Sequence, residues 1–202
     1  MKLIGITQRV CTLSSHQEQR DALDQRWASF LYACGCISYP IPNHLPSLNS
    51  ILRLPLQGII LTGGNSLNGE APERDQTEIA ILEYAMARGF PLLGVCRGMQ
   101  LILSYFGSHL EKVKGHVMPF HSINIEGKKR VVNSYHDYGS FKAHKPLQII
   151  GKSDDGVIEA IRHAYLPIHG IMWHPERNYP FHRSDQSLIH ELFSTKLSAP
   201  KN

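Results

Sequence analysis

Cys96 stands in a sequence setting in which a cysteine can act as a nucleophile. The apolar run at residues 92–95 leads into Gly94-x-Cys96-x-Gly98, and an amphipathic stretch follows. This order predicts a nucleophile elbow, where small residues let a strand and a helix approach closely through a sharp turn. The free N–H groups and the dipole at the start of such a helix favour the thiolate over the thiol. A buried free cysteine is more often a small core residue, so the flanking glycines carry the functional interpretation.

His174 and Glu176 are predicted to complete a catalytic triad with Cys96. They occur in Trp-His-Pro-Glu, at the end of the apolar run at residues 168–173, and Pro175 fixes the direction in which the chain leaves it. Glu176 lies two residues after His174, so its carboxylate can bind the second imidazole nitrogen and hold the ring as a general base. A lone histidine at a strand end is more often structural, and the Glu two residues on favours catalysis.

Gly63 and Gly64 follow the buried run at residues 59–62 and form a candidate oxyanion loop. Without side chains, the backbone N–H groups of such a loop can turn toward the oxyanion of a tetrahedral intermediate. We predict that the N–H groups of Gly64 and Arg97 are the two donors. A glycine pair on its own marks many ordinary turns, so this prediction depends on the other two segments.

In order and spacing, these three segments resemble the class I glutamine amidotransferase superfamily, whose cysteine nucleophile is followed much later by His-x-Glu. The resemblance covers nearly the whole chain. It is closest to the free-standing γ-glutamyl hydrolases, including the γ-glutamyl-GABA hydrolases, through residues 94–100, 132–136 and 173–176. It implies an enzyme that cleaves a γ-glutamyl amide C–N bond through the triad and a glutamyl-thioester intermediate, releasing glutamate. It also implies a flavodoxin-like, mostly parallel sheet with helices on both faces and a smaller antiparallel sheet.

The resemblance also implies which residues bind the small-molecule γ-glutamyl substrate. The expected contacts come from Gly63, Gln100, Ser134, Tyr135 and His136. Gln100 lies one helical turn after the nucleophile, and its amide offers the donor and the acceptor that a zwitterionic amino acid requires. For His136, a packed loop residue beside the site is the competing interpretation. This chemistry requires no metal and no organic cofactor.

A narrower resemblance concerns the leaving group. The chain has shorter loops than typical γ-glutamyl-GABA hydrolases, between Gly64 and Asp75 and between Gly107 and Val131. In size and in residues 4–9 and 62–68 it is more similar to the γ-glutamyl-CDP-amidate hydrolases of capsular phosphoramidate biosynthesis. That resemblance implies γ-glutamyl-CDP-amidate, or a related anionic phosphoramidate, as the substrate.

Cations after the predicted strand ends are candidates to face its phosphates, because loops there line the ligand crevice. They are Arg74, Lys112, Lys114, His116, Arg177, His182 and Arg183. A solvated basic surface explains them equally well. The alternatives for the whole chain are a general γ-glutamyl hydrolase, a glutaminase subunit that passes ammonia to a synthetase, and a catalytically silent binding module.

The elements that would position these residues alternate between short apolar runs and amphipathic stretches. We predict parallel strands over residues 3–7, 37–41, 58–62, 91–95 and 168–173, with helices over 18–33, 75–88, 98–106 and 187–197. Shorter strands over 121–125, 130–133, 147–152 and 157–162 predict a small mixed or antiparallel sheet in the second half. With no repeat and no linker, residues 1–202 are expected to form one domain.

Composition limits location and partners. The net charge of +4 comes from basic residues that are spread along the chain, which argues against a nucleic-acid partner. No signal peptide or membrane span is visible, so we expect a cytoplasmic protein, with a homodimer left open. The four cysteines have irregular spacing, typical of free thiols. For Cys34 and Cys36, core packing is favoured over a metal site.

Overall fold

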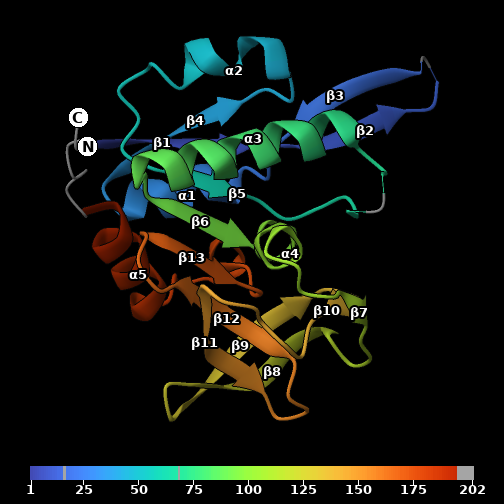
Figure 1. The fold of residues 1–202 in the computed structure, drawn as a ribbon, viewed down its shortest axis with the longest axis vertical. Coiled ribbons are helices and arrows are strands. Elements are labelled where there is room, and N and C mark those ends of the chain that lie inside the picture. Colours follow the sequence, from blue (N-terminus) through green and yellow to red (C-terminus); the bar gives the residue numbers. More distant parts are fainter. Residues whose placement is uncertain (16, 68, 195–202) are drawn as a thin grey trace.

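A nine-stranded mixed sheet forms the centre of the fold, as seen in a computed structural model that describes residues 1–15, 17–67 and 69–194 (Figure 1). Its first five strands are mutually parallel, in the order β4 (Cys36–Ile41), β1 (Lys2–Thr7), β5 (Ile59–Leu61), β6 (Leu92–Val95) and β13 (Ile168–Ile171). The other four are antiparallel, in the order β12 (Ile158–His163), β11 (Leu147–Ser153), β8 (Val117–Ile125) and β9 (Lys128–Tyr135). We call these the parallel half and the antiparallel half.

Helices cover both faces of the parallel half. One face packs against α2 (Leu45–Ile51), α3 (Pro72–Arg88) and α4 (Arg97–Tyr105), and the other against α1 (Arg26–Ala33) and α5 (Arg183–Ser194). Alternation along the strands divides the core accordingly, since Ile59 and Leu61 join the first cluster and Ile60 joins the second. Cys34 and Cys36 are buried in the second cluster.

This architecture confirms the predicted fold class. Numbered along the chain, the parallel strands have the order 2-1-3-4-5 of flavodoxin-like sheets. The antiparallel strands continue the same sheet through the β12–β13 pair. Two small antiparallel sheets lie outside it, one formed by β2 (Arg9–Leu13) with β3 (Glu18–Ala22) and one by β7 (Glu111–Lys112) with β10 (Tyr138–Gly139).

The predicted helix over residues 18–33 is wrong in its first part, where β2 and β3 form a hairpin. Residues 14–21 contain no apolar side chain that could face the core, so the amphipathic pattern begins only at Leu23. Asp24 then starts α1, because its carboxylate accepts the N–H of Arg26 at 3.0 Å and its carbonyl accepts the N–H of Trp27. The hairpin projects from the parallel half in Figure 1.

The remaining predicted elements are present with shifted ends. The closing helix α5 begins at Arg183, four residues earlier than expected, and the predicted residues 195–197 lie outside the described part of the chain. The sequence did not predict α2, a short helix that buries Leu48 and Ile51. Among the described residues, no helix combines the length and apolar character needed to cross a membrane.

Candidate active site

The candidate active site lies where four strands of the parallel half end. Thr7 ends β1, Thr62 follows β5, Cys96 follows β6 and His174 comes three residues after β13. The carboxyl ends of parallel strands share one edge of a sheet, which is where such sheets bind ligands. The fold therefore brings together segments that lie up to 167 residues apart in the sequence.

Cys96 occupies the predicted elbow and is 6% exposed. Its φ of +53° and ψ of −107° are rare for a residue with a side chain, and such strain persists only where the surroundings enforce it. The two flanking glycines are required by packing. A Cβ at Gly98 would lie 2.3 Å from the carbonyl oxygen of Leu61, and one at Gly94 would lie 2.6 Å from the Gly98 backbone. Small residues thus let β5, β6 and α4 converge on the cysteine.

His174 is held from two sides. Its Nδ1 lies 2.8 Å from Oε1 of Glu176, which sits in the short 3-10 helix η1 (Pro175–Arg177). Its backbone is bound by the Asn133 side chain, which accepts the His174 N–H and donates to the His174 carbonyl, each at 2.8 Å. Burial lowers the pKa of His174, but hydrogen bonds with Cys96 and Glu176 outweigh it and raise the pKa to about 9. The raised pKa favours the protonated imidazole at neutral pH, which is the form that can stabilise a neighbouring thiolate.

Gly63 and Gly64 form a loop against this pair. A Cβ at Gly63 would lie 2.7 Å from Cε1 of His174 and 3.4 Å from Cβ of Cys96, so the backbone passes directly beside the reactive groups. Behind the loop, Arg74 donates to the carbonyls of Thr62 at 2.7 Å, Gly63 at 3.2 Å and Gly64. Because C=O and N–H are antiparallel in a planar peptide, the N–H of Gly64 points away from Arg74.

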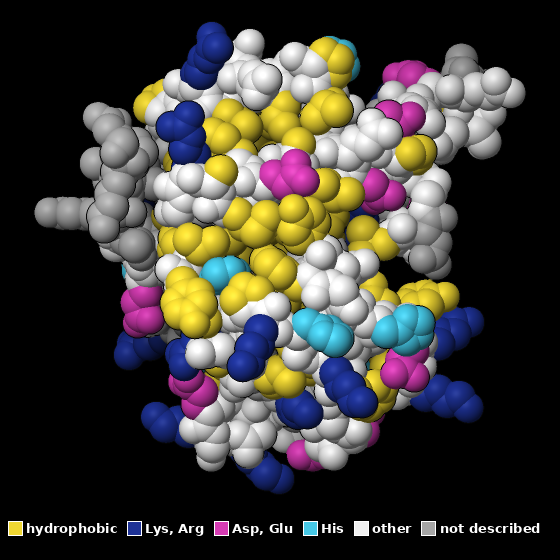
Figure 2. All heavy atoms as spheres, in the orientation of Figure 1, with side chains coloured by type: hydrophobic (Ala, Val, Ile, Leu, Met, Phe, Trp, Pro, Cys, Tyr) yellow, Lys and Arg dark blue, Asp and Glu magenta, His cyan; other side chains and the backbone are white. Residues whose placement is uncertain are grey.

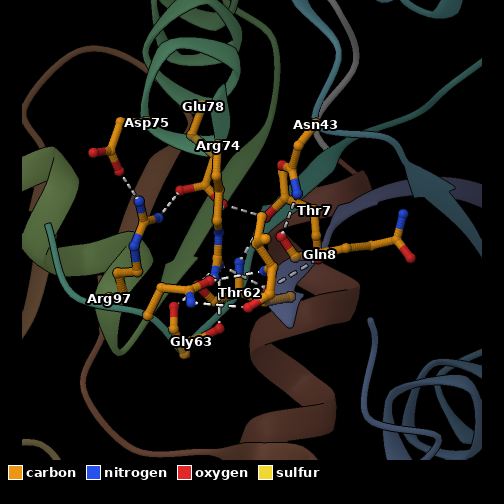
Figure 3. A network of polar contacts seen from close by, with 12 residues as sticks. Thr7, Gln8, Asn43, Thr62, Gly63, Arg74, Asp75, Glu78 and Arg97 are labelled. Carbon is orange, nitrogen blue, oxygen red and sulfur yellow. Dashed lines mark hydrogen bonds and ion pairs between the residues drawn. The ribbon is translucent and has the colours of Figure 1, made fainter. Parts of the chain in front are cut away.

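Arg74 belongs to a buried ionic network that sequence reasoning did not predict (Figure 3). Glu78 lies at its centre and binds Arg74 at 3.0 Å and the Arg97 guanidinium, and Thr7 donates to it at 2.6 Å. Arg97 also pairs with Asp75. The side chain that follows Cys96 is thus bound to α3. The i,i+4 spacing of Arg74 and Glu78 was the one available signal, and it usually marks a solvent-exposed pair.

Two pockets flank the loop. The cysteine-side pocket, of about 190 Å³, is lined by Cys96 and by Gln100, Tyr135 and His136 among others. The histidine-side pocket, of about 170 Å³, is lined by His174 and Glu176 together with Gly63, Arg9, Asp24, Trp27 and Arg177. Gly64 lines both pockets.

The predicted substrate-binding residues therefore do not all lie in one pocket. Gln100, Tyr135 and His136 line the cysteine-side pocket, whereas Gly63 lines the other pocket. Ser134 lines neither of these two pockets, and its hydroxyl instead donates to the carbonyl of His116 at 2.6 Å.

The predicted cations also lie in different places, and only some of them are at the site. Arg74 and His116 are buried and bonded within the protein, so the expectation that they face the phosphates of the substrate is wrong. Lys112 and Lys114 line a different hollow. Arg177 does lie at the site, with its guanidinium 4.7 Å from the ring of Tyr135.

Arg9, which sequence reasoning missed, is exposed beside Gly64. Its place is set by the β2–β3 hairpin, which the sequence did not predict either. Figure 2 shows that most of the Lys and Arg side chains visible in that view lie over the antiparallel half.

Comparison with known proteins identifies the family. Residues 2–176 match the family Peptidase C26. The chain belongs to the Peptidase C26 family. It is 33% identical over 180 residues to a γ-glutamyl-CDP-amidate hydrolase of Campylobacter jejuni, covering 86% of this chain and 90% of that protein. It is 31% identical over 169 residues to a glutamine-hydrolysing GMP synthase subunit of Pyrococcus furiosus, covering 79% of this chain and 86% of that subunit.

A solved structure agrees with the fold. A GMP synthase subunit homologue of Thermoplasma acidophilum superposes with a TM-score of 0.71 at 18% identity, covering 96% of this chain and 94% of the other. The predicted resemblance to the class I glutamine amidotransferases is therefore confirmed, as is the predicted class of enzyme. This Peptidase C26 member is an amidohydrolase with a cysteine nucleophile.

Proposed function

We propose that the chain hydrolyses γ-glutamyl amides with Cys96, His174 and Glu176 as its catalytic triad. One observation carries the proposal. Cys96 is held in a strained elbow, with the Glu176-bound imidazole of His174 on one side and a pocket suited to an amino acid on the other. A cationic base beside a cysteine at a helix N-terminus is the arrangement that activates a thiol.

The reaction then follows from these positions. The Cys96 thiolate attacks the γ-carbonyl carbon, and the N–H groups of Gly64 and Arg97 stabilise the oxyanion. Protonated His174 gives its proton to the leaving nitrogen as the C–N bond breaks, which leaves a glutamyl thioester. Neutral His174 next takes a proton from water as the water attacks the thioester. Glutamate leaves, and the thiolate and the imidazolium are restored.

The cysteine-side pocket is the proposed site for the glutamyl group. The amide nitrogen of Gln100 donates to the carbonyl of Tyr138 at 2.8 Å, which fixes the amide plane. The amide oxygen then remains to accept a hydrogen bond from an α-ammonium group. Tyr135 packs edge-on against the His174 ring, with 5.8 Å between ring centroids, so it closes the pocket beside the base.

The histidine-side pocket is the proposed site for the leaving group. Arg9 and Arg177 bring two guanidinium groups to this pocket, and guanidinium groups bind phosphate oxygens with paired, charge-assisted hydrogen bonds. The similar Campylobacter jejuni protein is named for a nucleotide-linked γ-glutamyl substrate. Together these observations support γ-glutamyl-CDP-amidate, or a related anionic γ-glutamyl phosphoramidate, as the substrate.

A substrate comparison tests the leaving group. We expect Arg9→Ala to lower kcat/KM for γ-glutamyl-CDP-amidate about 10-fold, the effect of losing one charge-assisted hydrogen bond, and to leave neutral γ-glutamyl amides unchanged. Arg183→Ala is the matched control, because Arg183 is exposed at the start of α5 and lines neither pocket. If neutral amides react as well as the nucleotide and Arg9→Ala affects both equally, the enzyme is a general γ-glutamyl hydrolase.

A glutaminase subunit is the second candidate, favoured by the similarity to the GMP synthase subunit of Pyrococcus furiosus. Such a subunit would use the same triad on glutamine and would depend on a synthetase. Steady-state glutamate release by the isolated chain separates the two. Turnover of γ-glutamyl-CDP-amidate without a partner supports the hydrolase. Absence of turnover with every amide until a synthetase is added supports the glutaminase.

A further inference from the structure

A second cluster of ionisable side chains is buried in the antiparallel half. His116 precedes β8, His121 lies within it, His136 follows β9 and Glu159 lies in β12. Glu159 is 0% exposed, and His116 and His136 are each 3% exposed. The candidate triad uses none of these four residues, and a buried carboxylate is costly unless it has a partner.

Three polar atoms of this cluster are nearly equidistant. His116 Nδ1 lies 3.1 Å from Glu159 Oε1 and 3.2 Å from His136 Nε2, and His136 Nε2 lies 3.3 Å from the same carboxylate oxygen. His121 Nε2 adds a fourth group, 3.6 Å from Glu159 Oε2. The ligand atoms of His116, His121 and Glu159 all lie within 4.8 Å of one another.

In His116 and His136, the ring nitrogen that points away from Glu159 carries a proton. His136 Nδ1 lies 3.0 Å from the carbonyl of Tyr138, which can only accept, so Nδ1 carries a proton. His116 Nε2 lies 3.0 Å from a carboxylate oxygen of Asp155, so it is protonated as well. In the neutral rings, the inner nitrogens therefore present lone pairs to each other and to the Glu159 carboxylate.

The centre of the cluster lacks hydrogen-bond donors. Within the described part of the chain, the two oxygens of Glu159 and the Nε2 of His121 have no hydrogen-bond partner. Lone pairs that converge in a buried space repel one another unless a cation lies between them. Either an extra proton on one imidazole or a metal ion supplies that cation.

We propose that His116, His121, His136 and Glu159 bind a divalent transition-metal ion of the zinc type. Ligand atoms 2.0–2.1 Å from a tetrahedral zinc ion are separated by about 3.3–3.4 Å. The 3.1–3.3 Å distances between His116 Nδ1, His136 Nε2 and Glu159 Oε1 are close to this value. Imidazole and carboxylate groups suit zinc and its neighbours in the first transition series. Metal-bound histidines also commonly donate their second N–H to a carboxylate or a backbone carbonyl, as His116 and His136 do here.

The ion would stabilise the loop that lines the cysteine-side pocket. The carbonyl of Tyr138 accepts hydrogen bonds from both His136 and Gln100, so the metal site and the proposed glutamyl site share one peptide group. This role rests on the proposed function, whereas metal binding itself does not. The metal acts here as a clamp between β8, β9 and β12, and the hydrolysis needs no metal.

Metal binding is tested on the full chain carrying Cys96→Ala, because a reactive thiolate beside an imidazole binds zinc by itself. After treatment with a chelator and gel filtration, the protein is titrated with Zn²⁺ and with Co²⁺. We expect one ion per chain by elemental analysis. We also expect a visible cobalt spectrum of tetrahedral type without the near-ultraviolet absorption of a thiolate ligand.

Asp155→Asn provides a variant that should fold, since the Asp155 side chain is half exposed and asparagine keeps the oxygen that binds Ser153. We expect it to weaken metal binding about 10–100-fold, the usual effect of losing a carboxylate behind a metal-bound histidine. Asp154→Asn, at the neighbouring exposed position, is the matched control and should bind as the parent does. His121→Ala and Glu159→Gln should retain no metal.

Two results would overturn the proposal. One is a parent protein that retains neither ion above the buffer blank, which would leave a shared proton as the cation in the cluster. The other is equal binding by the parent, Asp155→Asn, His121→Ala and Glu159→Gln, which would place the ion elsewhere. Neither result bears on hydrolysis of γ-glutamyl amides, which is measured with Cys96 intact.

Discussion

The parallel half buries Arg74, Arg97 and Glu78 in a network in which each charge has a partner of opposite sign, whereas the antiparallel half buries Glu159 against the ring nitrogens of three histidines. A closed network holds its neighbours in place, and here it holds the candidate oxyanion loop and the start of α4. An open cluster of lone pairs has the capacity to bind a cation. The two halves therefore use buried charge differently, one to position backbone groups and the other to bind a ligand.

The largest effect is expected when Cys96, in the parallel half, is replaced. Cys96→Ala should lower kcat by about 10⁴-fold or more, because it removes the proposed nucleophile. It should leave the fold intact, because only one sulfur atom is lost from the packing. Limited alkylation with iodoacetamide, followed by peptide mapping, should modify Cys96 first. Burial raises the pKa of Cys34 to about 12, so that residue stays a thiol, and the partly exposed Cys11 serves as the reference thiol. Loss of activity with another cysteine labelled would remove Cys96 from the mechanism.

The next effect separates the base from the group that orients it. His174→Ala should reduce kcat/KM by about 10⁴-fold, and Glu176→Gln by about 10²-fold, because the variant keeps the base but loses the carboxylate that fixes it. Steady-state kinetics on one γ-glutamyl amide measures both. Equal and mild losses would show that neither residue belongs to the triad.

A smaller effect is expected where the two halves are connected. Asn133→Ala removes both hydrogen bonds from β9 to the His174 backbone, and should lower kcat/KM about 10-fold and stability by about 1–3 kcal/mol. Asn133→Asp keeps the acceptor for the His174 N–H and should lie between the two proteins. Kinetics and chemical denaturation give the two numbers. Unchanged activity in Asn133→Ala would mean that the antiparallel half does not position the base.

The smallest effect concerns pH. The pKa of His174 is raised to about 9, so its proton is present at neutral pH and is lost as the pH rises through about 9. We expect kcat/KM to fall on the alkaline side near this value, together with the stability that the protonated ring contributes. In Glu176→Gln the fall should begin at lower pH, because one of the bonds that raise the pKa is gone. A pH profile with no alkaline fall below pH 10, about one unit above this value, would contradict the assignment.

The sequence was informative where the candidate site depends on residues that are close together in the sequence. The elbow around Cys96 and the pair His174 and Glu176 are each contained within a few positions, so their spacing predicted their geometry. Their roles stay predictions until they are tested. The network around Glu78 was missed because its members lie on β1, the loop after β5, α3 and α4, which meet only in the folded sheet. Glu159 was missed because a polar residue within a strand usually faces solvent.

The hairpin shows a different limit. A charged segment with no apolar face has no period that separates a helix from a strand, so residues 18–22 gave no reliable signal. The result matters for the site because that hairpin begins at Arg9. The side chain most directly placed for an anionic leaving group could therefore be found only once the backbone was known.

The two hydrogen bonds between Asn133 and the His174 backbone connect the candidate base to the edge of the sheet. β9 is the last strand in the order and, among the described residues, pairs with β8 alone. Edge elements open locally at a lower free energy than central ones. Opening of β9 would release the backbone of the base while the parallel half stayed folded. On heating, activity is thus expected to be lost when the edge of the antiparallel half unfolds. The core around Cys96 should unfold at a higher temperature.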